Sequence, residues 1–165
     1  MKHSLACILL GLALTVPGLA EPLKIPKDKP VASITFPDDW KTVVGSEGIT
    51  ASSEDGEVLI DIITTNPAVL GASIDKAFAL LHLKPDADTW KDVKSTMNGM
   101  NVVQHTLDAK DISKESNGTV VKLILTGVEV TKDKGVLVIQ RGTADSHKEH
   151  EAEVTAILES IAAIK

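Results

Sequence analysis

The sequence predicts an α+β fold, with a largely antiparallel sheet flanked by helices in the order β-β-β-α-β-β-β-β-α. Short β-type segments are separated by tight-turn signals, Asp55-Gly56 and Asn98-Gly99, which typically join antiparallel strands. Two other segments carry apolar residues at helical spacing. Two late segments are almost continuous Val, Ile and Leu, which is typical of central strands covered on both faces. These observations predict a layered α+β domain in which the two helices can cover the faces of the sheet.

The first three strands are predicted at residues 31–36, 49–53 and 57–64. The sequence Pro37-Asp38-Asp39 ends the first of these strands. The second and third flank the Asp55-Gly56 turn, where glycine accepts the positive φ of a tight hairpin. The sequence therefore predicts one strand followed by a hairpin.

A helix is predicted over residues 73–83, where apolar residues recur at helical spacing: Ile74, Ala77, Phe78 and Leu81. Ser73 is a suitable N-cap, and Pro85 stops the helix. Four strands then follow, at residues 92–97, 100–109, 119–130 and 136–141. The chain closes with a helix predicted over residues 147–164.

Residues 1–20 have the pattern of a secretory signal peptide, with a positive charge, a short apolar run and small residues before the cleavage site. Cleavage is predicted between Ala20 and Glu21, which places the mature protein in the periplasm or outside the cell. The proline-rich segment 21–30 is predicted as an extended lead-in. Residues 31–165 form a single predicted domain, with no membrane span after signal cleavage.

Composition excludes several kinds of partner and chemistry. The net charge is −6, and no Lys/Arg cluster is evident, which argues against binding nucleic acid or an anionic membrane surface. Cys7, the single cysteine, lies within the predicted signal peptide. The mature chain is therefore expected to have neither a disulfide nor a thiol nucleophile.

Three motifs resemble those of the Mog1/PsbP-like superfamily. They are Ile34–Trp40 (ITFPDDW), similar to an F-P-x-x-W strand end, Glu54–Ile62 (EDGEVLIDI), similar to the second hairpin, and Ile157–Ile161 (ILESI), similar to the terminal helix. The resemblance covers residues 31–163 and implies an α/β/α sandwich. Members of the superfamily include photosystem II accessory proteins, a Ran-binding protein and bacterial exported proteins, and most members are non-enzymatic.

No catalytic motif is found. The chain contains no G-x-S-x-G elbow, H-E-x-x-H zinc motif, phosphate-binding P-loop or G-x-G-x-x-G dinucleotide loop. The resemblance likewise offers no shared catalytic residues to place on this chain. We therefore expect a protein that is not an enzyme, and a hydrolase with dispersed acids or histidines is the least favoured hypothesis.

The stretch SHKEHEAE at residues 146–153 comes closest to a recognisable site. Ser146 and Glu149 have the S-x-x-E spacing of a capping box. A helical wheel directs His147 and His150 toward the sheet. One interpretation is two half-buried packing residues, each with a hydrogen bond. The other is a zinc, copper or nickel site, which needs further ligands.

His105 is the best candidate for a third metal ligand, and His82 is a weaker one. The sequence therefore predicts an exported, non-catalytic accessory or binding protein that acts through contacts with an unidentified protein partner. The alternative is a periplasmic metal-binding module that uses His147, His150 and His105 to bind Zn or Cu. No other cofactor is expected.

Overall fold

The computed structural model describes residues 21–164, except residues 47, 115 and 117. The predicted signal peptide and its cleavage site therefore lie outside the described residues. Within the described part, no helix is both long and apolar enough to cross a membrane.

The main feature is an eight-stranded sheet in the order β3-β4-β5-β10-β9-β8-β6, with β7 also paired to β8. All its described pairings are antiparallel. The strands are β3 (Lys41–Val44), β4 (Gly48–Ser52), β5 (Leu59–Thr65), β6 (Leu83–Pro85), β7 (Lys91–Met97), β8 (Met100–Asp111), β9 (Val120–Thr131) and β10 (Lys134–Gly142).

A second, three-stranded sheet has the order β1-β2-β11. Its strands are β1 (Leu23–Ile25), β2 (Ala32–Ile34) and β11 (Ala162–Ala163), and both pairings are antiparallel. The helical elements are the 3-10 turns η1 (Pro67–Val69) and η2 (Ala87–Thr89), and the α-helices α1 (Leu70–Leu80), α2 (Ala144–Glu149) and α3 (Glu151–Glu159).

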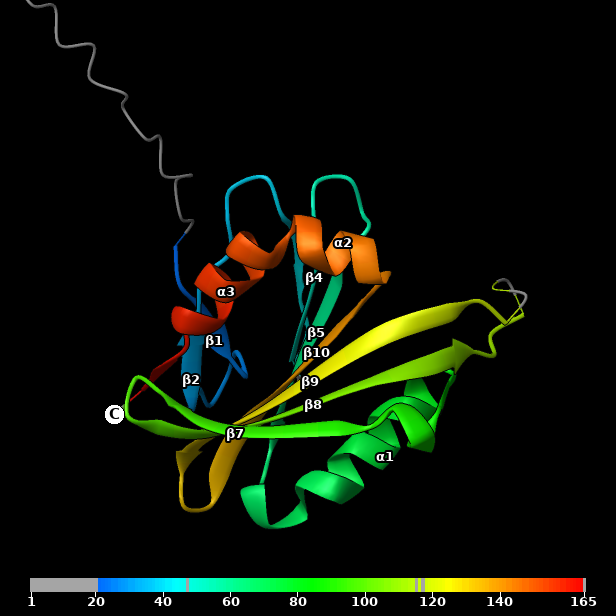
Figure 1. Cartoon of the computed structure of the whole chain (residues 1–165). Helices are drawn as coiled ribbons and strands as arrows, with labels where there is room; N and C mark the ends of the chain where they lie inside the picture. Colours follow the sequence, from blue (N-terminus) through cyan, green and yellow to red (C-terminus); the bar gives the residue numbers. More distant parts are fainter. Residues whose placement is uncertain (1–20, 47, 115, 117, 165) are drawn as a thin grey trace, which may run out of the picture.

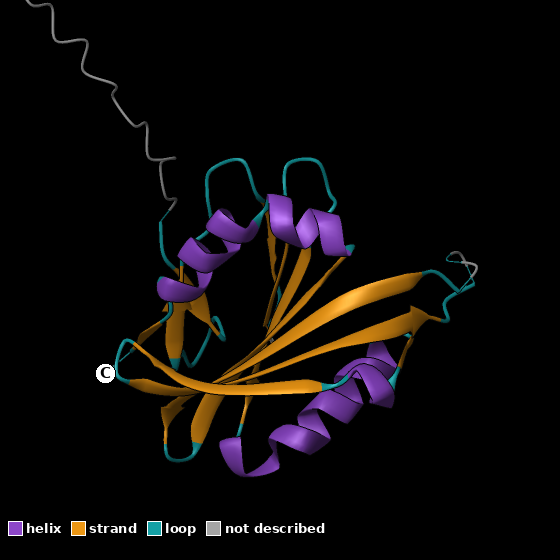
Figure 2. Cartoon of the chain, in the orientation of Figure 1, coloured by secondary structure: helices purple, strands orange, loops and turns teal. Residues whose placement is uncertain are grey.

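The large sheet lies between two layers. Helix α1 covers one face, whereas α2, α3 and the small sheet lie on the other (Figure 1). The same arrangement is visible when the chain is coloured by secondary structure (Figure 2). The predicted α+β class, largely antiparallel sheet and α/β/α layering are confirmed.

Alternating side chains on the central strands build two separate cores. Leu125 of β9 and Ile139 of β10 are paired and pack in the core under α1. Val136 and Val138 of β10 point to the other face, toward α3 and the small sheet. Because successive strand residues face opposite sides, each central strand contributes to both cores.

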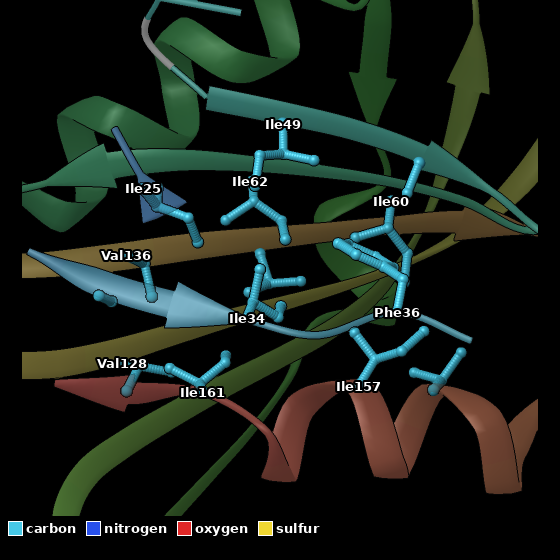
Figure 3. Close-up of a cluster of buried hydrophobic side chains, with 14 of the residues drawn as sticks. Ile25, Ile34, Phe36, Ile49, Ile60, Ile62, Val128, Val136, Ile157 and Ile161 are labelled. Carbon is cyan, nitrogen blue, oxygen red and sulfur yellow. The ribbon is translucent and has the colours of Figure 1, made fainter. Parts of the chain in front are cut away.

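The core on the α3 side contains the largest group of buried side chains (Figure 3). Ile157 of α3 and Ile161, two residues after it, are fully buried. Their side chains point toward Ile34 and Phe36. Ile60 of β5 lies against the same group. The closing segment is therefore held to the sheet by apolar packing.

Four short strands were not predicted from the sequence. β1 lies inside the segment predicted as an extended lead-in, and β11 inside the segment predicted as helix. β3 lies in a segment to which no element was assigned, and β6 begins at Leu83, the last residue of the predicted first helix. Strands of two to four residues are too short to show a periodic pattern, and all four residues of β3 are exposed.

Both helix starts also differ from prediction. The first helical segment begins at Pro67, because the Asn66 side chain accepts a hydrogen bond from the Ala68 amide and caps η1. Ser73 is not an N-cap but lies inside α1, where its hydroxyl bonds the Val69 carbonyl. The closing helix is two helices that meet at His150, and it ends at Glu159 rather than residue 164.

We expect Ile157→Ala to reduce the free energy of unfolding by about 2–5 kcal/mol, because it removes a fully buried side chain and leaves a cavity. Urea denaturation measures the loss. Leu80→Ala is the matched control, since Leu80 is 67% exposed near the end of α1 and its truncation should change stability by less than about 0.5 kcal/mol. Equal losses in both variants would contradict the proposed packing of α3.

Candidate functional site

The SHKEHEAE stretch lies where β10 leads into α2, and its capping box is formed differently from prediction. Thr143 is the N-cap, and its hydroxyl accepts a hydrogen bond from the Ser146 amide at 3.0 Å. The Ser146 hydroxyl accepts one from the Thr143 amide at 2.8 Å. The predicted pairing of Ser146 with Glu149 is therefore wrong, because the helix begins three residues earlier.

His147 is partly buried against the sheet, as the helical wheel predicts. Its Nε2 lies 3.2 Å from the carbonyl oxygen of Lys122 on β9. Burial lowers the pKa of His147, and the hydrogen bond to the carbonyl only partly opposes this effect. The ring is therefore neutral at pH 7, with Nε2–H donating to the carbonyl.

His150 lies at the break between α2 and α3, with an acidic side chain at each ring nitrogen. Nδ1 is 3.1 Å from Oε2 of Glu153, and Nε2 is 3.1 Å from Oδ2 of Asp55. A neutral imidazole has a single N–H, so only the protonated ring can donate to both carboxylates. Burial alone lowers the pKa of His150, but these two carboxylates more than offset it, and the pKa is raised.

Neighbouring groups hold the two carboxylates in place. Trp40 is buried, and its Nε1–H donates to Oε2 of Glu153 at 2.9 Å. Asp55 accepts from the Ser53 hydroxyl at 2.6 Å and from the Glu57 amide at 3.0 Å. These two hydrogen bonds are the main reason that the pKa of Asp55 falls to about 2.

We call His150, Asp55, Glu153 and Trp40 the His150 cluster. It joins three segments that are distant in sequence: the turn after β2, the β4–β5 hairpin and the start of α3. A shallow pocket beside it is lined by the His150 ring and by acidic residues, Asp39, Glu54, Asp55 and Glu153. In this cluster a protonated imidazole ring lies between two carboxylates and ties these segments together.

His105 forms a second histidine–carboxylate pair. Its Nδ1 lies 2.6 Å from Oδ1 of Asp92, which also accepts a hydrogen bond from the Trp90 ring N–H. The Trp90 and His105 rings have centroids 5.1 Å apart. His105 is paired across strands with Leu125, which belongs to the core under α1, so the pair lies on the α1 face of the sheet.

The structure does not bring His105 to His147 and His150. His147 and His150 lie on the face that carries α2 and α3, so the sheet separates them from His105. Among the residues that the structure describes, no group of three His, Cys, Asp or Glu side chains is placed to hold a metal ion. Zinc or copper binding by these histidines stays a prediction.

Sequence reasoning missed the groups that contact the histidines. Asp55 was interpreted only as part of a turn, and Glu153 only as an acid in the first part of a helix. The useful signal for Glu153 is its spacing of three residues from His150, which places the two on neighbouring positions of a helix. No sequence signal places Asp55 beside His150, because 95 residues separate them.

Comparisons with known proteins identify the fold. No family model and no curated protein sequence matches the chain. It is similar to the solution structure of cyanobacterial PsbP (CyanoP) from Synechocystis sp. PCC 6803, with a TM-score of 0.53 and 11% identity, over 96% of this chain and 98% of that one. It is also similar to LpqN of Mycobacterium tuberculosis, described as involved in cell envelope biogenesis, with a TM-score of 0.52 and 16% identity, over 89% and 92%. The chain therefore has the Mog1/PsbP-like fold.

Replacement of Thr143 by Ala should cost about 1 kcal/mol of stability, because it removes the hydroxyl that accepts the Ser146 amide at the start of α2. Thermal or urea denaturation measures the change. Thr155→Ala is the control, because Thr155 is exposed within α3 and makes no cap, so its replacement should leave stability unchanged or slightly raised. If Thr143→Ala behaves like the control, the cap is misassigned.

The two histidines should give opposite pH dependences of stability. Folding raises the pKa of His150, so its stabilisation is fully present below the ordinary value of 6.5 and is lost as pH rises through the folded value. Folding lowers the pKa of His147, so its effect on stability increases as pH rises toward 6.5. Urea denaturation at about pH 5 and about pH 8.5 separates these effects.

In His150→Gln, stability should therefore fall less between the low and the high pH than in the unmodified protein. In His147→Gln it should fall more over the same interval. Asp55, with a pKa of about 2, stays ionised at both pH values and adds no change of its own. Identical pH dependence in the two variants and the unmodified protein would contradict a His150 ring that is protonated between Asp55 and Glu153 in the folded state.

Proposed function

We propose that the chain is an exported, non-catalytic accessory protein that acts by binding another protein. The observation that carries this proposal is the exposure of apolar side chains on both edges of the large sheet. Val43 of β3 is 69% exposed and Val93 of β7 is 58% exposed. Single exposed apolar residues are common, but sheet edges also present unpaired backbone groups, which make them ready sites for protein contact.

The polar clusters support a non-catalytic role. His147 bonds a backbone carbonyl, and His150 and His105 bond carboxylates. Within the part of the chain that the structure describes, no histidine ring is hydrogen-bonded to a hydroxyl or thiol, the arrangement that activates a nucleophile. The polar groups instead connect secondary-structure elements.

Export is supported by the signal-peptide pattern of residues 1–20. The fold agrees with this location, because LpqN is described as involved in cell envelope biogenesis. CyanoP, the cyanobacterial PsbP, has the same fold. An accessory role outside the cytoplasm, with one protein partner, is the function that these observations support best.

Site-specific photo-crosslinking in cells that naturally produce the protein tests the proposal. A photoreactive amino acid replaces Val43 or Val93, both exposed on edge strands, and Thr155, exposed on α3, serves as the control position. We expect one discrete crosslinked product from at least one edge position and none from Thr155. Absence of any product, or the same products from all three positions, would contradict a specific protein partner.

A further inference from the structure

The two edges of the large sheet differ in how well they are protected. Among the described residues, β3 forms one edge and pairs with β4 alone, whereas β7 lies on the opposite edge and pairs with β8 alone. Three of the seven β7 residues are charged: Lys91, Asp92 and Lys94. Charged side chains, especially Lys, discourage the addition of another strand.

β3 carries fewer charges than β7. Its sequence is Lys-Thr-Val-Val, and all four residues are exposed. Val43 is 69% and Val44 is 40% exposed, and Lys41 is the only charge. An exposed edge of β-branched residues with one charge is a template for strand pairing.

We propose that β3 takes up an extended segment of the partner protein as an additional antiparallel strand. This inference rests on the proposed function and specifies how the partner is bound. The free backbone N–H and C=O groups of β3 require an extended backbone opposite them, so the occupant is a strand rather than a helix. The β3 side chains then select its sequence.

The α1 face of the sheet has room beside β3. Helix α1 packs over the centre of the sheet, and a shallow depression remains open beyond it, lined by Val43, Thr50 and Ile63 among others. Ile63 also lines the next depression, which reaches Lys76 and Leu80 on α1. Side chains of an added strand that point to this face therefore meet Val43 and Ile63 together with the polar side chains of Thr50 and Asp61.

Charge sets the register of an added antiparallel strand. Asp61, the acid in this depression, is already paired with Arg141 at 2.8 Å and with the Thr50 hydroxyl at 2.9 Å. Lys41 shares a strand face with Val43, because they are two residues apart. An antiparallel partner is therefore favoured when an apolar residue lies opposite Val43 and an acid two positions later lies opposite Lys41.

A second copy of this chain fits less well. In an antiparallel pair of β3 strands centred on Thr42 and Val43, Lys41 lies opposite Val44 of the other copy and finds no acid. The charge pattern therefore favours an acidic segment of a different protein.

The probe is the peptide acetyl-Ser-Thr-Val-Val-Thr-Glu-Thr-Ser-amide, in which the second Val pairs with Val43 and the Glu with Lys41. NMR titration of the exported protein should give saturable amide shifts concentrated on β3. Lys41→Glu should weaken binding about fivefold, and a peptide with Lys in place of Glu should bind this variant better than the unmodified protein. Val93→Asp, on the opposite edge, should leave binding unchanged.

Shifts centred on β7, or no effect of the charge exchange, would overturn strand addition at β3. Dimerisation that Val43→Asp abolishes, measured by sedimentation, would assign the edge to self-association instead. The crosslinking positions separate this inference from the proposed function. Products from Val93 without products from Val43 leave a protein-binding function but refute the β3 site, and products from neither position refute both.

Discussion

Two-sided burial of β10 is the constraint on which the rest of the structure depends. The run from Gly135 to Gln140 is buried, with Val136 and Val138 on one face and Leu137 and Ile139 on the other. A strand with apolar residues on both faces needs a cover on each side. Helix α1 supplies one cover, and α3 with the small sheet supplies the other. The histidine–carboxylate contacts lie outside these two apolar cores.

The same constraint explains why the histidines separate. His105 lies on the face of Leu125, whereas His150 belongs to the layer that packs on the opposite face. His105 binds Asp92, and His150 binds Asp55 and Glu153, each pair at the rim of its own core. Partial burial strengthens these contacts, because fewer water molecules compete with them. The histidine–carboxylate hydrogen bonds therefore connect segments at the edges of the two apolar cores.

Much of the fold could be predicted from sequence, because long segments carry a clear period. The runs in β9 and β10 and the turn residues Gly56 and Gly99, both with positive φ, were recognised correctly. Four strands of two to four residues, β1, β3, β6 and β11, were missed because they are too short to show a period. The orientation of His147 and His150 followed from the wheel, but the carboxylate of Asp55 did not, because only the folded hairpin places it beside His150.

The small sheet has a consequence for the order in which the chain folds. β2 lies between β1, from the beginning of the described chain, and β11, from its end, with Ser33 paired to Ala162. Contacts between residues so far apart in sequence form slowly, because a long loop must close first. The Ile34 side of the core therefore stays open during folding until α3 and β11 pack against it.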